Sequence, residues 1–196
     1  MSELDRDGFL RIASTFYAAG MLEGEAYREA PETKRFMDAW ERTLSKHENW
    51  KKMVKRIKSE LPPGMGAGDT TGPGAMAAQR CCVYLEPPAG PRPGEPFPVI
   101  VALASVLVPY YHLYQLKVSI GTGDYVSGPP RPRPREGMEG RIADLVAKHI
   151  EQETGYKEFP SEYESIVVPG ICVRNLLPGQ ATLLDALFDD ARDNIP

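Results

Sequence analysis

Residues 97–116 read FPVIVALASVLVPYYHLYQL, twenty residues without one formally charged side chain. A transmembrane helix needs about 20 predominantly apolar residues, but here Pro109 interrupts the run after the strongly apolar residues 99–108. Because residues 99–108 are rich in Val and Ala, they predict a strand buried on both faces, with a buried helix as the alternative. We therefore expect this segment to form the centre of a soluble domain and not to enter a membrane.

The residues after Pro109 alternate between apolar and polar side chains. Gln115, Lys117 and Ser119 share one parity, and a period of two predicts a strand with one buried face. His112 falls on the other parity, so we expect it to point inward. The apolar or aromatic residues on that parity are Tyr110, Tyr114, Leu116, Val118 and Ile120.

The first sixty residues have helical spacing. Apolar residues recur at steps of three and four over residues 9–17, and Ser2 with Asp5 is a candidate N-terminal cap. A second apolar stripe over residues 36–61 predicts one helix of about eight turns that ends at Pro62.

Two further helices are predicted in the second half of the chain. Residues 137–154 carry an apolar face, and Gly155 stands at the expected C-terminal position. Residues 181–188 predict a short helix in which Thr182 and Asp185 form a cap pair. We expect the longer helix to cover the sheet.

The order of these elements predicts the fold class. Short strands are expected at 80–86 and 165–173, the second of them an edge or bulged strand because proline and glycine break it. Helices first, strands next and helices again predict an α+β fold. It consists of a helical N-terminal segment and a small mixed or antiparallel sheet covered by one long and one short helix. We expect a helical region over 1–62, a Gly/Pro-rich linker or loop over 63–78, and an α+β core over 79–196, which is either separate from 1–62 or continuous with it.

Charge is segregated along the chain, although the formal net charge is only −4. Residues 34–60 carry nine Lys or Arg against four acids, whereas residues 151–196 carry nine acids against three bases. Segregated charge speeds encounter with an oppositely charged partner. The acids predicted to contact a partner are Glu151, Glu153, Glu158, Glu162, Glu164, Asp189 and Asp190. A further possible function is that of an adaptor or structural subunit, which would dock through the basic helix at 46–58 or the arginine-proline loop at 129–135.

No cofactor or metal motif is present in the sequence. Cys81, Cys82 and Cys172 lack the spacing of a metal knuckle, and we expect them to be buried as free thiols. His47 and His149 each fall in the apolar stripe of a predicted helix, so both are expected to point inward. The sequence thus predicts no catalytic constellation, no cofactor and no metal. The acidic N-terminus lacks the features of an export signal, which predicts a cytoplasmic protein.

The C-terminal quarter resembles a known class of proteins. Residues 166–170 (IVVPG), followed by an irregular turn and residues 177–188 (LPGQATLLDALF), are similar to the ending of small α+β immunity-type proteins encoded beside bacterial polymorphic toxins. The resemblance implies a cytosolic, cofactor-free protein that binds a cognate toxin and neutralises it. These proteins share no active-site residues that could be transferred to this chain.

Together, these observations predict a non-enzymatic cytoplasmic protein-binding module, and foremost an immunity protein that binds and neutralises a cognate bacterial toxin. Neither specific nucleic-acid binding nor membrane insertion is expected. The alternative is a small enzyme or ligand-binding domain with a pocket at the tyrosine- and histidine-rich strand over 110–120. That pocket would use Tyr110, His112 and Tyr114, together with Cys172.

Overall fold

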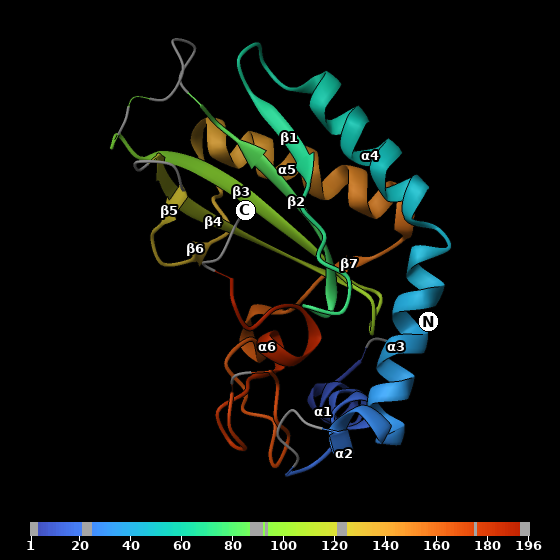
Figure 1. The fold of residues 1–196 in the computed structure, drawn as a ribbon. Helices are drawn as coiled ribbons and strands as arrows, with labels where there is room; N and C mark the ends of the chain where they lie inside the picture. The colour runs from blue at the N-terminus through green and yellow to red at the C-terminus, as the bar shows by residue number, and fades with distance from the viewer. Residues whose placement is uncertain are drawn as a thin grey trace.

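The computed structural model describes residues 4–20, 25–86, 92, 94–120, 125–174 and 176–192. Within these residues the chain forms six α-helices, one 3-10 turn over Ser161–Tyr163 and a seven-stranded sheet, which confirms the α+β class (Figure 1). The helices are α1 (Arg6–Phe16), α2 (Glu25–Glu29), α3 (Pro31–Leu44), α4 (His47–Glu60), α5 (Gly137–Thr154) and α6 (Leu183–Leu187). The strands are β1 (Gly66–Asp69), β2 (Ala78–Tyr84), β3 (Phe97–Ser105), β4 (Tyr110–Ile120), β5 (Tyr125–Ser127), β6 (Arg131–Pro132) and β7 (Lys157–Glu158).

The sheet is almost entirely antiparallel. Its order is β1-β2-β3-β4-β5, and β6 and β7 pair with β4 beside β5. Among the strand pairs of the described residues, β7 with β4 is the one parallel pair. Val101 of β3 lies opposite Tyr114 of β4 and Cys82 of β2, so the residues predicted to be apolar occupy the middle of the sheet.

The burial of β3 follows the predicted pattern, whereas β4 has its predicted buried face and also buries part of the other. In β3 every residue except Pro98 is buried, as expected for a strand covered on both faces. In β4 the predicted inward residues Tyr110, Tyr114, Leu116 and Val118 are buried. Tyr111 and Leu113 on the other face are buried too, because α5 and α4 cover that face.

Two hydrophobic cores lie on the two faces of the sheet. One core joins α4 and α5 to the face that carries Ile100 and Leu113. The helical residues of that core are Trp50, Met53, Val54, Ile57, Ile142, Ala143, Val146, Ala147 and Ile150. The other core joins α1, α6 and the C-terminal loops to the face that carries Val101 and Tyr114. Helices from both ends of the chain therefore share their cores with the same sheet.

The predicted long helix over 36–61 is in fact two helices. α3 ends at Leu44 and α4 begins at His47, because Lys46 leaves the helical conformation at φ −114° and ψ 6°. Figure 1 shows the two helices following one another along one side of the molecule. The indole N–H of Trp40 in α3 donates to the carbonyl oxygen of Met76 at 2.9 Å, whereas α4 packs on the sheet. Because of the break, the apolar side chains of α3 and those of α4 pack against different parts of the molecule. The short helix α2 was not predicted.

Residues 66–69 correct the prediction of a linker or loop over 63–78. They form the edge strand β1, which pairs with residues 81–84 of β2. Gly66 and Gly68 give this strand no apolar alternation, so the sequence pattern that reveals other strands is missing here.

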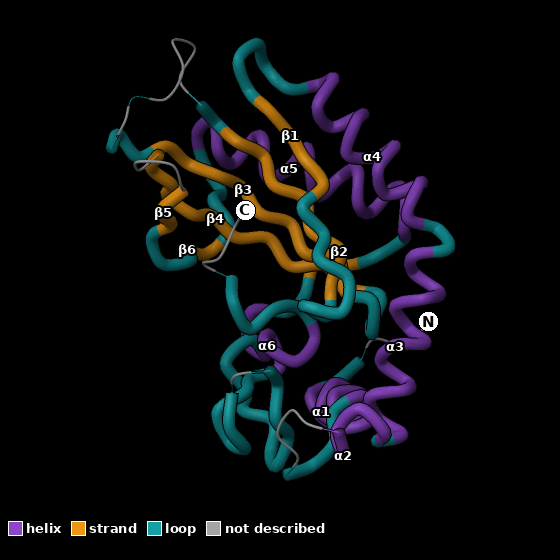
Figure 2. The backbone as a smooth tube through the Cα atoms, viewed as in Figure 1, coloured by secondary structure: helices purple, strands orange, loops and turns teal. Residues whose placement is uncertain are grey.

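The predicted strand over 165–173 is also wrong. Single bridges from Val167, Ile171 and Val173 replace a continuous ladder. Gly170 has φ +75°, and Pro169 lacks a donor, so the chain turns where a strand would have to continue. Figure 2 shows the chain between α5 and α6 as mostly loop.

Helix caps agree with the sequence where they are described. The carboxylate of Asp5 accepts a hydrogen bond from the Gly8 amide at 2.8 Å, and Gly155 ends α5 at φ +70°. Thr182 and Asp185 form the predicted capping box of α6. Ser2, the other predicted cap residue of α1, lies outside the described residues. Among the helices of the described ranges, none combines the length and the apolar content that crossing a membrane requires.

Gly140 in α5 gives a first prediction. Glycine-to-alanine changes within a helix usually stabilise it by about 1 kcal/mol. A Cβ at position 140 would, however, lie 2.6 Å from the backbone carbonyl carbon of Arg135. We therefore expect Gly140→Ala to lower the free energy of unfolding by about 1–3 kcal/mol in urea titrations. Gly66→Ala is the control, since no atom lies within 4 Å of its Cβ position. Stabilisation of the protein by Gly140→Ala would contradict the close contact.

Candidate functional site

The acids predicted to form a partner-contacting face are largely engaged within the molecule. Glu151 accepts a hydrogen bond from the Tyr111 hydroxyl at 2.6 Å, and Glu153 forms an ion pair with Arg56 of α4. The remaining pairs on this side are Glu158 with Arg133 and Arg135, and Glu164 with His112. Glu162 is exposed, and the described residues include no partner for it.

Asp189 and Asp190 do not lie on an exposed acidic face. Asp189 is 2% exposed, and its Oδ2 lies 3.6 Å from a guanidinium nitrogen of Arg80. Asp190 pairs with Arg174 at 3.4 Å, and its side chain is 4% exposed. Burial raises the pKa of both carboxyl groups. Asp189 is therefore buried and Asp190 half-buried, each beside an arginine.

The residues of the alternative pocket are packed into the core. Tyr110, His112 and Tyr114 share one face of β4, and all three are buried. The His112 ring stacks on Tyr114 with centroids 5.6 Å apart and lies 5.9 Å from Phe188. Cys172 is buried as a free thiol, as are Cys81 and Cys82, as predicted. None of the four pocket residues lines either of the two cavities described below.

His112 is held neutral by its surroundings. Burial, followed by the positive charge of Arg192, lowers its pKa to about 3. Glu164 lies 3.4 Å from Nδ1, but its carboxyl group is itself partly buried, and burial raises its pKa. The loss of solvation therefore outweighs the attraction between these two groups.

The pKa of His112 predicts a pH dependence of stability. Below the unfolded pKa of about 6.5 the unfolded chain binds a proton that the folded protein excludes, so stability falls as the pH falls from about 6.5 towards 3. We expect the exclusion of this proton from His112 to lower the free energy of unfolding by about 2 kcal/mol at pH 5.0 relative to pH 7.5. Urea unfolding of the wild type and of His112→Phe at both pH values measures it. The variant should lose less stability on acidification, and equal losses would show that His112 becomes protonated in the folded protein.

The basic helix carries charges that the described part of the chain leaves unpaired. We call Lys51, Lys52, Lys55 and Lys58 of α4 the lysine stripe. All four side chains are exposed, and Lys51 pairs with Glu48 at 2.9 Å. Lys52, Lys55 and Lys58 have no ion pair among the described residues. With 1.5 Å of rise per residue, the stripe extends over about 10 Å of helix.

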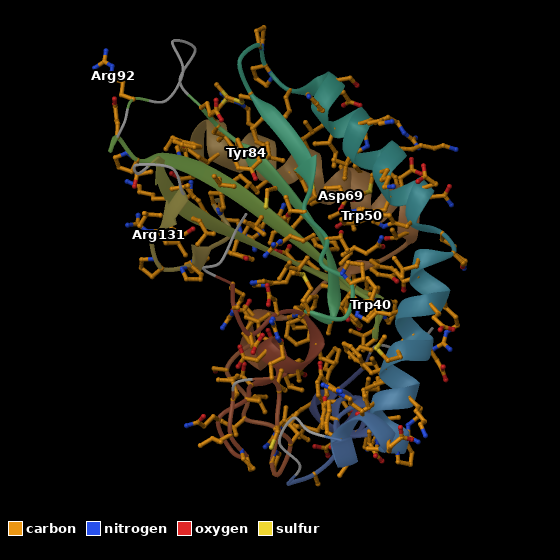
Figure 3. The ribbon with its side chains drawn as sticks, in the orientation of Figure 1. Trp40, Trp50, Asp69, Tyr84, Arg92 and Arg131 are labelled. Atoms are coloured by element: carbon orange, nitrogen blue, oxygen red, sulfur yellow. The ribbon has the colours of Figure 1, made fainter. Side chains whose placement is uncertain are left out.

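A polar network fixes the start of α4 to the edge of the sheet. His47 Nε2 lies 2.9 Å from Asp69 Oδ2, and the indole N–H of Trp50 donates to Asp69 Oδ1 at 3.3 Å (Figure 3). Asp69 Oδ1 also accepts a hydrogen bond from the Thr71 hydroxyl at 2.6 Å. His47 Nδ1 lies 2.8 Å from the side-chain amide nitrogen Nε2 of Gln79. Because both ring nitrogens of His47 are engaged, the network holds α4 in place. His47 is half-buried, and the other helical histidine, His149, is buried with Nε2 3.0 Å from Glu60.

Two of the cavities among the described residues lie beside the helices. The larger, which we call the α3–α5 cavity, has a volume of about 410 Å³. Its walls come from α3, α4, the C-terminal end of α5, the start of β2 and the residue that follows β3, and include Arg42, Lys46, Trp50, Gln79 and Tyr156. The smaller, of about 230 Å³, lies between α2, α3 and the C-terminal segment. Each carboxylate on its wall, from Asp185, Asp189 and Asp190, has an arginine within 4 Å.

The two cavities differ in what they offer a ligand. The acids of the smaller cavity are already compensated, whereas Arg42 and Lys46 at the α3–α5 cavity have no ion pair among the described residues. Sequence reasoning missed the α3–α5 cavity because its walls come from segments that only the tertiary fold brings together. The described residues contain no group of three His, Cys, Asp or Glu side chains placed to hold a metal ion.

Comparisons of the chain with protein-family models, with curated proteins and with solved structures gave no match.

Proposed function

We propose that the protein is a cytoplasmic protein-binding module of the immunity type, which binds and neutralises a cognate bacterial toxin through the lysine stripe of α4. The observation that carries this proposal is the contrast between the two charged regions. The acids of the C-terminal region are mostly paired internally, while Lys52, Lys55 and Lys58 are exposed without an ion pair among the described residues. On α4, positive charge is therefore available to a partner.

The lysine stripe stands on a rigid support. Trp50, Met53 and Ile57 of α4 are buried in the core beneath it, and the Asp69 network fixes the N-terminal end of the helix. A surface that keeps its shape loses less entropy when it binds. Met37 and Leu44 of the preceding helix are 48% and 42% exposed. Because they lie seven residues apart on α3, both lie on one face of that helix.

The stripe specifies the chemistry of the partner. Exposed lysines accelerate encounter with an acidic surface and contribute less to the final affinity. We therefore assign the protein partner an acidic contact surface, which reverses the sign expected from the acidic residues of the sequence. Apolar residues of that partner would contact Met37 and Leu44.

The test is co-purification of the tagged protein from its native host at low salt, with mass spectrometry of the bound material. Two double variants accompany the wild type. Lys52→Glu/Lys55→Glu changes the stripe. Lys117→Glu/Arg131→Glu makes the same change in net charge at exposed positions of β4 and β6, and because Arg131 lies in the arginine-proline loop it also tests that loop as the competing docking surface. Arg131 lies at the edge of the sheet opposite to the one beside α4 (Figure 3).

We expect the wild type and the Lys117/Arg131 variant to retain one stoichiometric protein that the Lys52/Lys55 variant loses. Expression of that protein alone should stop growth, and co-expression with the wild type should restore it. Equal retention by both variants would contradict the role of the stripe. A retained protein that is not toxic would contradict the immunity function but would still support the lysine stripe as a binding surface.

A further inference from the structure

We infer that the α3–α5 cavity binds a small planar anion, an aromatic ring that carries a phosphate or carboxylate group. This site is separate from the lysine stripe and goes beyond the proposed function. The argument combines the size of the cavity, the two uncompensated cations at its wall and the aromatic side chains beside them.

The dimensions of the cavity suit a small molecule. Its volume of about 410 Å³ falls within the range of about 300–1,000 Å³ that ligand sites occupy. Its apolar lining comes from Ala39, Trp50, Met53 and Val106. An apolar surface with a few convergent polar groups is the usual composition of such sites.

The charges at the wall favour an anion. Arg42 and Lys46 are both exposed, and neither has an ion pair among the described residues. The acid at the wall, Glu153, is engaged by Arg56. An arginine fork together with a lysine ammonium matches the oxygens of a phosphate or carboxylate.

The remaining lining residues favour a flat ring. Trp50 and Tyr156 supply aromatic surface, and Asn49 and Gln79 supply amide groups for the edge of a ring. Trp50 is fixed by its hydrogen bond to Asp69, and Gln79 by its contact with His47. Burial raises the pKa of Tyr156, so its hydroxyl stays neutral and adds no negative charge to the site.

Isothermal titration calorimetry tests the inference with four probes. Adenosine 5′-monophosphate and 1-naphthoate each carry a planar ring and an anionic group, whereas adenosine and inorganic phosphate each lack one of the two. We expect at least one ring anion to bind at least about tenfold more tightly than both adenosine and phosphate. Binding of only the monophosphate would assign a phosphate ligand, and binding of only the naphthoate a carboxylate ligand.

Matched variants locate the binding. Arg42→Gln/Lys46→Gln removes the two cations of the cavity, and Lys52→Gln/Lys55→Gln removes two from the lysine stripe. We expect the first pair of substitutions to weaken the affinity for the ring anion about tenfold or more, and the second pair to leave that affinity within about twofold of the wild type. Thermal melts establish that both variants are folded.

Three results would overturn the inference. The first is that neither ring anion binds at concentrations up to about 10 mM. The second is that both double variants weaken binding equally, and the third is that phosphate binds as tightly as the ring anions. The last result would mean an adventitious ion only. Because the stripe variant tests the protein partner and the cavity variant tests the ligand, the two proposals fail independently.

Discussion

Replacing Asp189 with alanine is expected to lower the free energy of unfolding by about 3–5 kcal/mol. Asp189 and Arg80 are 2% and 7% exposed at their side chains, and their charged atoms lie 3.6 Å apart. The substitution removes a carboxylate from beside a buried guanidinium group, which keeps its hydrogen bonds to Thr70 but loses this opposing charge. The same change also frees the Ala191 amide, which donates to Asp189 Oδ1 at 3.0 Å.

Urea unfolding followed by circular dichroism measures the effect of Asp189→Ala. Glu29→Ala is the surface control, because Glu29 and Lys34 form an ion pair with side chains 74% and 61% exposed. That change should cost at most about 1 kcal/mol. Arg80→Met/Asp189→Leu should recover much of the lost stability, since apolar residues replace both buried charges. Equal small losses for Asp189→Ala and Glu29→Ala would contradict the buried pair.

Replacing Phe9 with alanine is expected to cost about 3–5 kcal/mol of stability as well. Phe9 of α1 is fully buried, with its ring centroid 5.1 Å from that of Tyr110 and 5.0 Å from that of Phe159. Both contacts have edge-to-face geometry, which adds to the burial of apolar area. The alanine variant leaves a cavity between the N-terminal helix and the sheet.

The Phe9 variants also test whether the N-terminal helices and the sheet unfold together. Phe9→Leu fills most of the space and should cost less than the alanine change. Tyrosine fluorescence and far-ultraviolet circular dichroism should give coincident transitions for the wild type and both variants. Separate transitions would show that residues 1–62 form a region of their own. A loss below about 1 kcal/mol for Phe9→Ala would contradict the close packing of α1 on the sheet.

Local patterns in the sequence predicted the centre of the fold. The apolar run of β3 predicted a strand buried on both faces. The alternation of β4 predicted the buried face that carries Tyr110 and Tyr114. The Thr182 and Asp185 cap and the Gly155 stop are equally local, because each depends on residues within one helical turn. These elements were therefore visible without any knowledge of the tertiary structure.

The candidate site could not be predicted in the same way. Arg56 of the basic region pairs with Glu153 of the acidic region, so part of the opposite charge is neutralised within the molecule. Net charge along the chain cannot reveal such pairing. The break at Lys46 and the edge strand β1 likewise depend on contacts with distant segments. For these reasons the sequence favoured the acidic residues, whereas the structure leaves the lysines available.

The most direct test of the central claim is the association rate of the purified protein with its captured partner, measured at 20 mM and 200 mM salt. We expect Lys52→Glu/Lys55→Glu to slow association at least about tenfold at low salt and to flatten the salt dependence. Lys117→Glu/Arg131→Glu should keep a rate and a salt dependence much closer to those of the wild type. Equal effects of the two variants would show that net charge alone drives the encounter, and an unchanged rate for the Lys52/Lys55 variant would remove the lysine stripe from the interface.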